Sequence, residues 1–361
     1  MNFRFFAKTF YILLTIFIAL NALIWFSWVK DLTDPKLKKG DLLRLGYLQG
    51  FTTPAMQSPP LPAHHIEAKD YNGQKIDMIS IGDSFSMGNS LQVGCYQDHL
   101  ASHFNISILN IPTQKDLSFH PVTILIQLIN SGYLDRIKPK YLLLQSIERE
   151  AASRLSSDFN LTKTSTISEL ESKFSKRGNA MQQGDQRDDQ SFDFNLKFIN
   201  NGNWKFVTNN VQYLFRDNAF KSKVIKSKLK QHFFSSPQGD VLLFHRDDYT
   251  AARTTNPQTM TTVNDNLNIL ADLLKTKGIS LIFMPAPDKL TLYEPYLKKR
   301  TYPKSIFFEE LRKLPRRYTF VDTKEILAKE LSAGVKDLYY QDDTHWSWKA
   351  PAAISKSFIL P

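Results

Sequence analysis

The sequence has almost no cysteine, and this shortage limits what the protein can be. A single cysteine, Cys95, is present among 361 residues, so an intramolecular disulfide is excluded. We interpret Cys95 as a small buried hydrophobic residue in a helical segment rather than as a nucleophile. The absence of an internal repeat excludes a repeat architecture.

The histidines lack the spacing of a metal site. His99 and His103 lie four residues apart on an expected helix, but no third ligand follows at a suitable spacing. The pair His64-His65 lies in a proline-rich stretch, and His245 neighbours charged residues. We therefore predict no metal site, and we interpret these histidines as ordinary surface or core residues.

Acidic residues are fewer than basic ones, 35 against 46, which gives a net charge of +11. Basic residues cluster within 221–230 and 298–317. No nucleic-acid-binding motif accompanies them, so nucleic acid is not an expected partner. We interpret the clusters as solvated surface that also favours anionic lipid headgroups. A docking face for an acidic glycan or a partner protein is the alternative.

One long hydrophobic run is present, from Thr9 to Val29. As a helix it spans roughly 30 Å of hydrocarbon. It ends in bulky residues around Trp25 and Trp28 rather than in a small-residue cleavage site, which favours an uncleaved anchor over a signal peptide. The expected organisation is a cytoplasmic tip and transmembrane anchor at 1–30, followed by a domain outside the cytoplasm.

The remainder of the chain has the composition of a folded protein, with 42% hydrophobic and 22% charged residues. Prolines and weak periodicity predict a stalk or linker at 31–74. Residues 75–361 are expected to form one catalytic domain. Residues 151–260 interrupt its pattern and are predicted to be an insertion or cap, with 175–190 as a mobile loop.

The pattern of that domain alternates between strands and helices, which predicts an α/β fold with a doubly wound parallel sheet covered on both faces. The expected strands are 76–81, 106–111, 141–147, 279–284 and 318–322. The expected helices include 121–134, 263–274 and 348–358.

Two short motifs far apart in the chain have the residues of one active site. Gly82-Asp83-Ser84 follows the first expected strand, where open α/β sheets bind ligands and free N–H groups can stabilise an oxyanion. Asp342-Asp343-Thr344-His345 lies near the C-terminus and offers a base with an orienting carboxylate. The sequence therefore predicts Ser84 as nucleophile and His345 as its base, with Asp343 preferred narrowly over Asp342 as the acid.

These motifs resemble the SGNH, or GDSL, hydrolase superfamily, and within it the SGNH-like proteins that O-acetylate alginate and other bacterial exopolysaccharides. The likeness covers about 75–150 and 262–350. It includes Asp343-Thr344-His345-Trp346, Met284 to Lys289 with Tyr293 following, and Leu143 to Arg149. The alginate proteins have the Asp-x-His segment before the serine segment, whereas serine comes first here. A circular permutation would reconcile the two orders.

The resemblance implies a flavodoxin-like SGNH fold and a membrane-anchored O-acyltransferase, with acetyl as the expected group and no cofactor. It also implies an extracytoplasmic polysaccharide substrate and a polytopic membrane-bound O-acyltransferase partner that delivers the acetyl group. The expected location is the bacterial inner membrane, single-pass, with the domain in the periplasm. The alternatives are an SGNH esterase or deacetylase, and a non-catalytic glycan-binding assembly subunit.

Further residues are candidates for oxyanion or substrate binding. The superfamily's oxyanion glycine and asparagine are not recognisable, and other residues occupy their positions. The candidates are Gly82, Asp83, Gln114, Gln145, Arg149, Lys289, Tyr293 and Trp346. The alternative for each is a structural role, which for Lys289 and Tyr293 is closure of the loop after the fourth strand.

Overall fold

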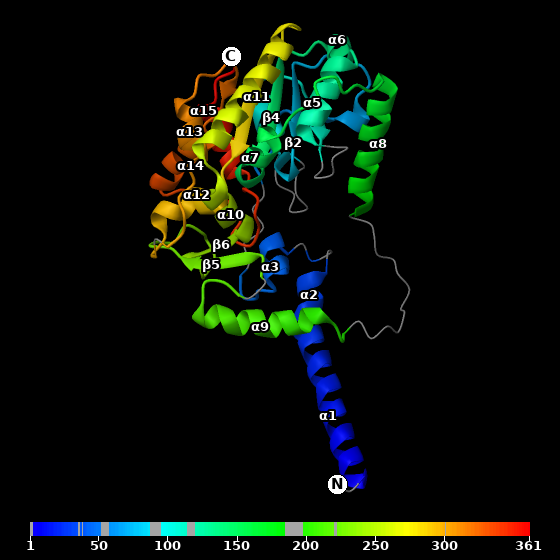
Figure 1. Ribbon diagram of the computed structural model, residues 1–361, viewed down its shortest axis with the longest axis vertical. Helices are drawn as coiled ribbons and strands as arrows, with labels where there is room; N and C mark the ends of the chain where they lie inside the picture. Colours follow the sequence, from blue (N-terminus) through cyan, green and yellow to red (C-terminus); the bar gives the residue numbers. More distant parts are fainter. Residues whose placement is uncertain are drawn as a thin grey trace.

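The computed structural model describes residues 3–34, 37, 39–51, 58–86, 95–113, 120–184, 198–219, 222–299 and 301–361. Its centre is a parallel sheet of six strands in the order β1-β3-β2-β4-β7-β8 (Figure 1). The strands are β1 (Ile66–Glu67), β2 (Met78–Gly82), β3 (Ile108–Pro112), β4 (Tyr141–Ile147), β7 (Ser280–Ala286) and β8 (Thr319–Phe320). The expected α/β fold is confirmed.

Alternate residues of the inner strands pack into two separate cores. In β2, Ile79 and Ile81 face one core, and Met78 faces the other. Because side chains alternate across a strand, a continuous apolar run such as β4 can serve both cores at once. The two faces are therefore both covered by helices.

The helices divide between the two faces. The first core contains residues of α5 (Pro121–Asn130), α6 (Tyr133–Ile137), α7 (Glu148–Ser156), α8 (Ile167–Gly184), α11 (Pro257–Lys275) and α13 (Phe307–Lys313). The second contains residues of α4 (Tyr96–Phe104), α12 (Lys289–Tyr293), α14 (Thr323–Ser332) and α15 (Lys349–Ser357). The other helical elements of the sheet domain are η3 (Ala68–Asp70), η4 (Ser84–Ser86), α10 (Arg246–Thr254) and η5 (Glu294–Tyr296).

Strand order reverses between β2 and β4. The chain passes from β2 to β3 on one side, and then returns to form β4 on the other side of β2. At such a switch point the loops after neighbouring strands separate and leave a crevice at the carboxyl edge of the sheet. Ser84 follows β2, and Arg149 follows β4, so both expected site segments begin at this crevice.

Three expectations about local structure were wrong. The expected helix 121–134 is divided into α5 and α6, because Gly132 adopts a left-handed conformation with φ of 78°. The expected loop 175–190 is helical as far as Gly184, and 185–190 lie outside the described residues. The expected linker 31–74 contributes β1, which pairs with β3 at the sheet edge.

The N-terminal segment is long and apolar enough to cross a membrane. It comprises α1 (Phe3–Ile24), a π-helical turn η1 (Trp25–Val29) and α2 (Lys30–Thr33). Figure 1 shows α1 extending away from the rest of the protein, with the C-terminus at the opposite end of the molecule.

A small layer lies between this helix and the sheet domain (Figure 1). It contains α3 (Asp41–Gly46), α9 (Asn201–Phe215) and an antiparallel pair, β5 (Val224–Lys228) and β6 (Val241–His245). Its core joins the end of the apolar helix to the insertion, since Val29, Leu42, Phe206 and Leu243 share one cluster. The insertion is narrower than the expected 151–260, because α7 and α11 cover the sheet itself.

Candidate active site

The turn after β2 is held in one conformation by buried contacts. A Cβ atom at Gly82 would lie 1.7 Å from Ser86 Oγ and 2.7 Å from Gln145 Oε1, so only glycine fits this position. Asp83 accepts hydrogen bonds from Ile147 N at 2.7 Å and from the Arg154 guanidinium at 2.8 Å. The turn leaves Ser84 exposed while the residues on either side of it are buried.

Ser84, His345 and Asp343 form a hydrogen-bonded series. His345 Nε2 lies 2.9 Å from Ser84 Oγ, and His345 Nδ1 lies 2.6 Å from Asp343 Oδ1. The ring of Phe85 packs against the imidazole with centroids 4.7 Å apart. These distances suit a serine nucleophile, a base and an orienting carboxylate.

Electrostatics favour a charged pair at the carboxylate end of this series. Burial alone would raise the pKa of Asp343, but the charge and hydrogen bonds of His345 hold it well below its ordinary value. Burial likewise opposes protonation of the imidazole, but the carboxylates of Asp343 and Asp41 outweigh it and raise the pKa of His345. The arrangement therefore stabilises the imidazolium that forms when the serine gives up its proton.

Asp342 has different partners from Asp343. Its Oδ2 accepts from Gly40 N at 3.3 Å, and its main-chain oxygen accepts from Leu42 N at 3.1 Å and Leu43 N at 3.4 Å. The structure thus brings Asp343 to the imidazole and Asp342 to the start of α3.

The start of α3 forms hydrogen bonds in both directions with the loop that contains Asp343, Thr344 and His345. Asp41 N donates to Asp343 Oδ2 at 3.1 Å, while the Asp41 carboxylate accepts from Thr344 N at 2.7 Å and Thr344 Oγ1 at 2.6 Å. A Cβ atom at Gly40 would lie 2.1 Å from Asp342 O, so the approach is as close as glycine allows. The segment expected to be a linker is therefore part of the site.

The Lys289 side chain forms hydrogen bonds with the main chain of the same loop. Its ammonium donates to the main-chain oxygens of Tyr340, Gln341 and Asp343 at 2.7 to 3.0 Å, and the side chain is buried. Burial lowers the pKa of Lys289 to about 8, and nearby carboxylates act in the opposite direction. Its surroundings fit the structural alternative of loop closure rather than contact with substrate.

Two other candidates are buried rather than exposed to a substrate. Tyr293 is fully buried and packs against Phe233 and Phe234. Trp346, which follows His345 in the chain, is buried and its ring makes a T-shaped contact with Phe85. The expectation of substrate contact was wrong for Tyr293 and Trp346, because both belong to the second core.

Of the two glutamine candidates, Gln145 lies among the described residues. Gln145 is fully buried, and its Oε1 accepts from Asp83 N at 3.1 Å and Ser86 Oγ at 3.0 Å. The side-chain oxygen of Gln145 therefore faces the turn that contains Ser84. An oxygen acceptor in this position does not supply a hydrogen-bond donor for an oxyanion. Gln114 lies outside the described residues.

Arg149 is neutralised by two buried carboxylates. Its guanidinium lies 2.9 Å from Asp288 Oδ1 and 3.3 Å from Asp248 Oδ1. Burial alone would lower the pKa of Arg149, but these carboxylates outweigh burial and hold the pKa above its ordinary value. These ion pairs join the residues after β4 to α10 and to the loop before Lys289. Since its guanidinium is engaged by two carboxylates, Arg149 is suited to a structural role rather than to donating a hydrogen bond to an oxyanion.

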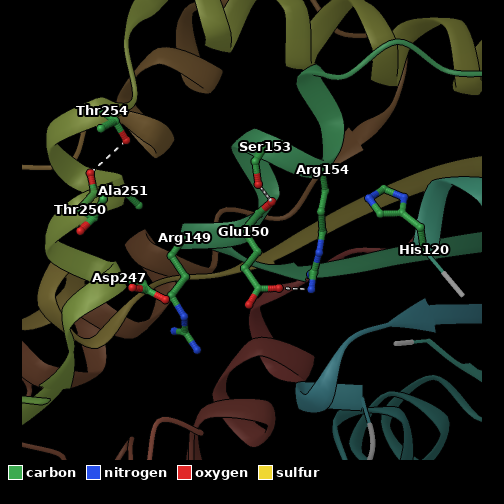
Figure 2. Close-up of a pocket in the computed structure, with 9 residues that line it drawn as sticks. All are labelled: His120, Arg149, Glu150, Ser153, Arg154, Asp247, Thr250, Ala251 and Thr254. Atoms are coloured by element: carbon green, nitrogen blue, oxygen red, sulfur yellow. Dashed lines mark hydrogen bonds and ion pairs between the residues drawn. The ribbon is translucent and has the colours of Figure 1, made fainter. Parts of the chain in front are cut away.

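An open pocket of about 490 Å³ lies beside this arginine. Figure 2 shows Arg149, Glu150 and Arg154 of α7 between α10 and His120. The full lining is His120, Arg149, Glu150, Ser153, Arg154, Asp247, Thr250, Ala251 and Thr254. Ser84 does not line the pocket, but the Arg154–Asp83 ion pair connects its wall to the residue before the serine.

Two clusters have the residue types of a metal site among the described residues. Asp41, Asp343 and His345 form one, and its imidazole is already bound to Asp343 and Ser84. His65, Cys95 and Asp98 form the other. Burial opposes protonation of His65, but hydrogen bonds to Asp98 and Glu67 raise its pKa to about 9.

The His65 ring nitrogens therefore already have carboxylate partners, at 2.6 Å to Asp98 and 3.0 Å to Glu67. A charged imidazolium in that position joins the sheet edge to α4. Cys95 sits at the N-cap of α4, with burial as the main cause of a raised thiol pKa, which accords with an unreactive thiol.

Sequence reasoning missed Gly40, Asp41 and Arg154. Their partners lie far away in the chain, and no local pattern marks them. The only signal at the first two is a Gly-Asp pair before an apolar Leu-Leu step, which is typical of a helix start. Arg154 resembles any charged residue in the last turn of a helix.

Comparison with protein families agrees with the motif resemblance. Residues 240–356 match the family model described as the SGNH hydrolase-like domain of acetyltransferase AlgX. The suspected similarity to SGNH-like O-acetyltransferases is thereby confirmed for this segment. The match includes Asp343 and His345 and excludes Ser84. No match is found among the curated proteins.

Proposed function

We propose that this protein is an O-acyltransferase, with acetyl as the transferred group, that acts through an acyl ester on Ser84. The single observation that carries the proposal is the series from Ser84 through His345 to Asp343, at 2.9 and 2.6 Å. The match of residues 240–356 to an acetyltransferase family supports the same chemistry.

In the first half-reaction, Ser84 Oγ attacks the carbonyl carbon of the acyl donor while His345 Nε2 takes the hydroxyl proton. Asp343 stabilises the imidazolium. The tetrahedral intermediate collapses, the bond to the donor's leaving group breaks, and His345 returns its proton to that group. The product is an ester on Ser84. The main-chain N–H of Ser84 serves as an oxyanion donor.

In the second half-reaction, a sugar hydroxyl attacks the ester carbonyl and gives its proton to His345. The bond to Ser84 Oγ breaks, His345 protonates the serine, and the acylated sugar leaves. The pocket beside Arg154 serves as the acceptor subsite, since its wall is tied to Asp83 and its lining offers charged and hydroxyl side chains for a saccharide.

The cellular setting belongs to the same proposal. The apolar helix anchors the protein by a single pass in a bacterial inner membrane, with the sheet domain on the periplasmic side. The substrate is an extracytoplasmic polysaccharide. A polytopic membrane-bound O-acyltransferase supplies the acyl group, so the protein itself needs no cofactor.

An esterase is the second candidate, and two observations favour it. Ser84 is exposed to solvent, and the order of serine before histidine is that of ordinary SGNH hydrolases. In both cases the acyl-enzyme is the same, and the difference is whether a sugar or water attacks it first.

Transfer and hydrolysis are separated by following an activated acetyl ester with and without an oligosaccharide. The proposal expects slow release of acetate alone and acetylated sugar when the oligosaccharide is present. Fast acetate release that the sugar does not divert would identify an esterase. No turnover and no adduct would favour a glycan-binding subunit.

A further inference from the structure

Helix α9 has three distinct faces. Its buried face contains Gly202, Asn203, Phe206, Asn209 and Tyr213, at the three- and four-residue spacing of one helical side. An apolar stripe recurs at a similar spacing on a second side and consists of Trp204, Val207, Val211, Leu214 and Phe215. A polar stripe lies between the two on one side of the helix and consists of Asn201, Lys205, Thr208 and Gln212.

The apolar stripe is open to solvent. Trp204, Leu214 and Phe215 are 70%, 75% and 82% exposed. Single exposed apolar residues are ordinary on protein surfaces, but five on one side of a 15-residue helix form a continuous patch. Such a patch beside a polar stripe is typical of a helix that lies in the plane of a membrane surface.

The position of α9 supports that assignment independently. Its buried face packs against the end of the apolar N-terminal helix, where Phe206 stacks on Trp28 at 5.5 Å. Asn203 Nδ2 donates to Asn21 Oδ1 at 3.0 Å, and Phe198, just before α9, stacks on Phe26. Figure 1 shows α9 running across the end of α1 at a wide angle.

The depth of this contact matches a bilayer boundary. From Thr9, the first residue of the apolar run, to Trp28 an α-helix rises about 28 Å, close to the roughly 30 Å of a hydrocarbon core. If Thr9 marks the cytoplasmic boundary, then the contact of Phe206 with Trp28 lies at the opposite boundary. The exposed cations Arg216 and Lys223, beyond the end of α9, suit anionic headgroups at that level.

We infer that α9 is a second membrane contact, which lies in the outer interface of the bilayer with its apolar stripe among the upper acyl chains. The inference rests on the anchoring proposed above. A lipid surface is favoured over a protein partner because α9 packs against the end of the spanning helix, so a bilayer around that helix would lie beside the exposed stripe. Two contacts would fix the height and tilt of the sheet domain above the membrane.

The test uses the full chain in vesicles of phosphatidylethanolamine and phosphatidylglycerol. A Cys95→Ser background removes the native thiol, and a solvent-sensitive fluorophore is attached to Val211→Cys on the apolar stripe. Gln212→Cys, the adjacent position on the polar stripe, is the matched control. Ile16→Cys in α1 reports anchoring separately. Each label is quenched by nitroxide on the upper or the lower acyl chain, and by iodide on both sides.

The inference expects the label at 211 to emit at shorter wavelength than the label at 212, and to be quenched by the upper nitroxide. The label at 212 should be quenched by iodide. Iodide quenching at 211, with the label at 16 in lipid, would overturn the inference and leave anchoring intact. Shielding of 211 from every quencher would assign the stripe to a protein contact instead. A label at 16 outside lipid would overturn anchoring itself.

Discussion

Asp41 N donates a hydrogen bond to Asp343 Oδ2 at 3.1 Å, across 302 residues of sequence. The carboxylate that orients His345 is therefore held by the helix that follows the apolar N-terminal segment. This contact couples the proposed anchor to the proposed chemistry, because movement of α3 would move the loop that carries Asp343 and His345.

Gly40→Ala should reduce kcat/KM by about a hundredfold, because a displacement of about 1 Å at a reacting group can have that effect. The added Cβ would lie 2.1 Å from Asp342 O and force α3 away from the loop. Steady-state kinetics measure the change, and circular dichroism checks that the fold persists. Lys39→Ala is the control, since it changes the neighbouring position without adding an atom. Equal activity in the two variants would contradict the coupling.

Asp343→Asn and Asp342→Asn should differ sharply. Loss of the carboxylate on His345 Nδ1 is expected to lower kcat by about 10³ to 10⁴, as an amide would favour the wrong tautomer. Asp342→Asn should retain most activity, because an amide oxygen can still accept from Gly40 N. Both variants carry the same chemical change. A larger loss in Asp342→Asn would reverse the assignment of the acid.

The pH profile should depend on Asp41. His345 acts as a base only when neutral, and its pKa is raised by Asp343 and Asp41 against the opposing effect of burial. Activity should therefore increase as pH rises through this raised pKa. Asp41→Asn removes one of the charges that raise the pKa of His345, so the acidic limb of kcat/KM should move to lower pH. A limb that stays in place or moves to higher pH would refute this electrostatic role.

Lys289→Met should destabilise the fold as well as the site. Three buried main-chain oxygens would lose their donor, and a buried group left unsatisfied costs about 1–3 kcal/mol. Thermal unfolding should show a lower Tm, and turnover should fall with it. Lys304→Met, at an exposed position, is the control. Unchanged Tm with altered KM would instead indicate substrate contact by Lys289.

The sheet and the serine–histidine pair were predictable because their signals are local. Continuous apolar runs identify β2, β4 and β7, and the Gly-Asp-Ser and Asp-Thr-His motifs lie directly after or between such elements. The contacts of Asp41 and Arg154 were not predictable, since each depends on a partner far away in sequence. The short strand β1 was missed for a similar reason, because two residues carry no periodicity and only pairing with β3 defines them.

The roles of Lys289, Tyr293 and Trp346 show a second limit. Position next to a motif indicates proximity to the site, but it does not say whether a side chain faces substrate or the interior. All three are buried, and packing decides their roles.

The most direct measurement is mass spectrometry of the intact protein and its peptides after reaction with an activated acetyl ester. The proposed acyl-enzyme mechanism predicts one acetyl group on the peptide that contains Ser84, lost on addition of an acceptor, and no such adduct in Ser84→Ala. An acetyl group on another residue as the reaction intermediate, or an adduct that persists in Ser84→Ala, would contradict this mechanism.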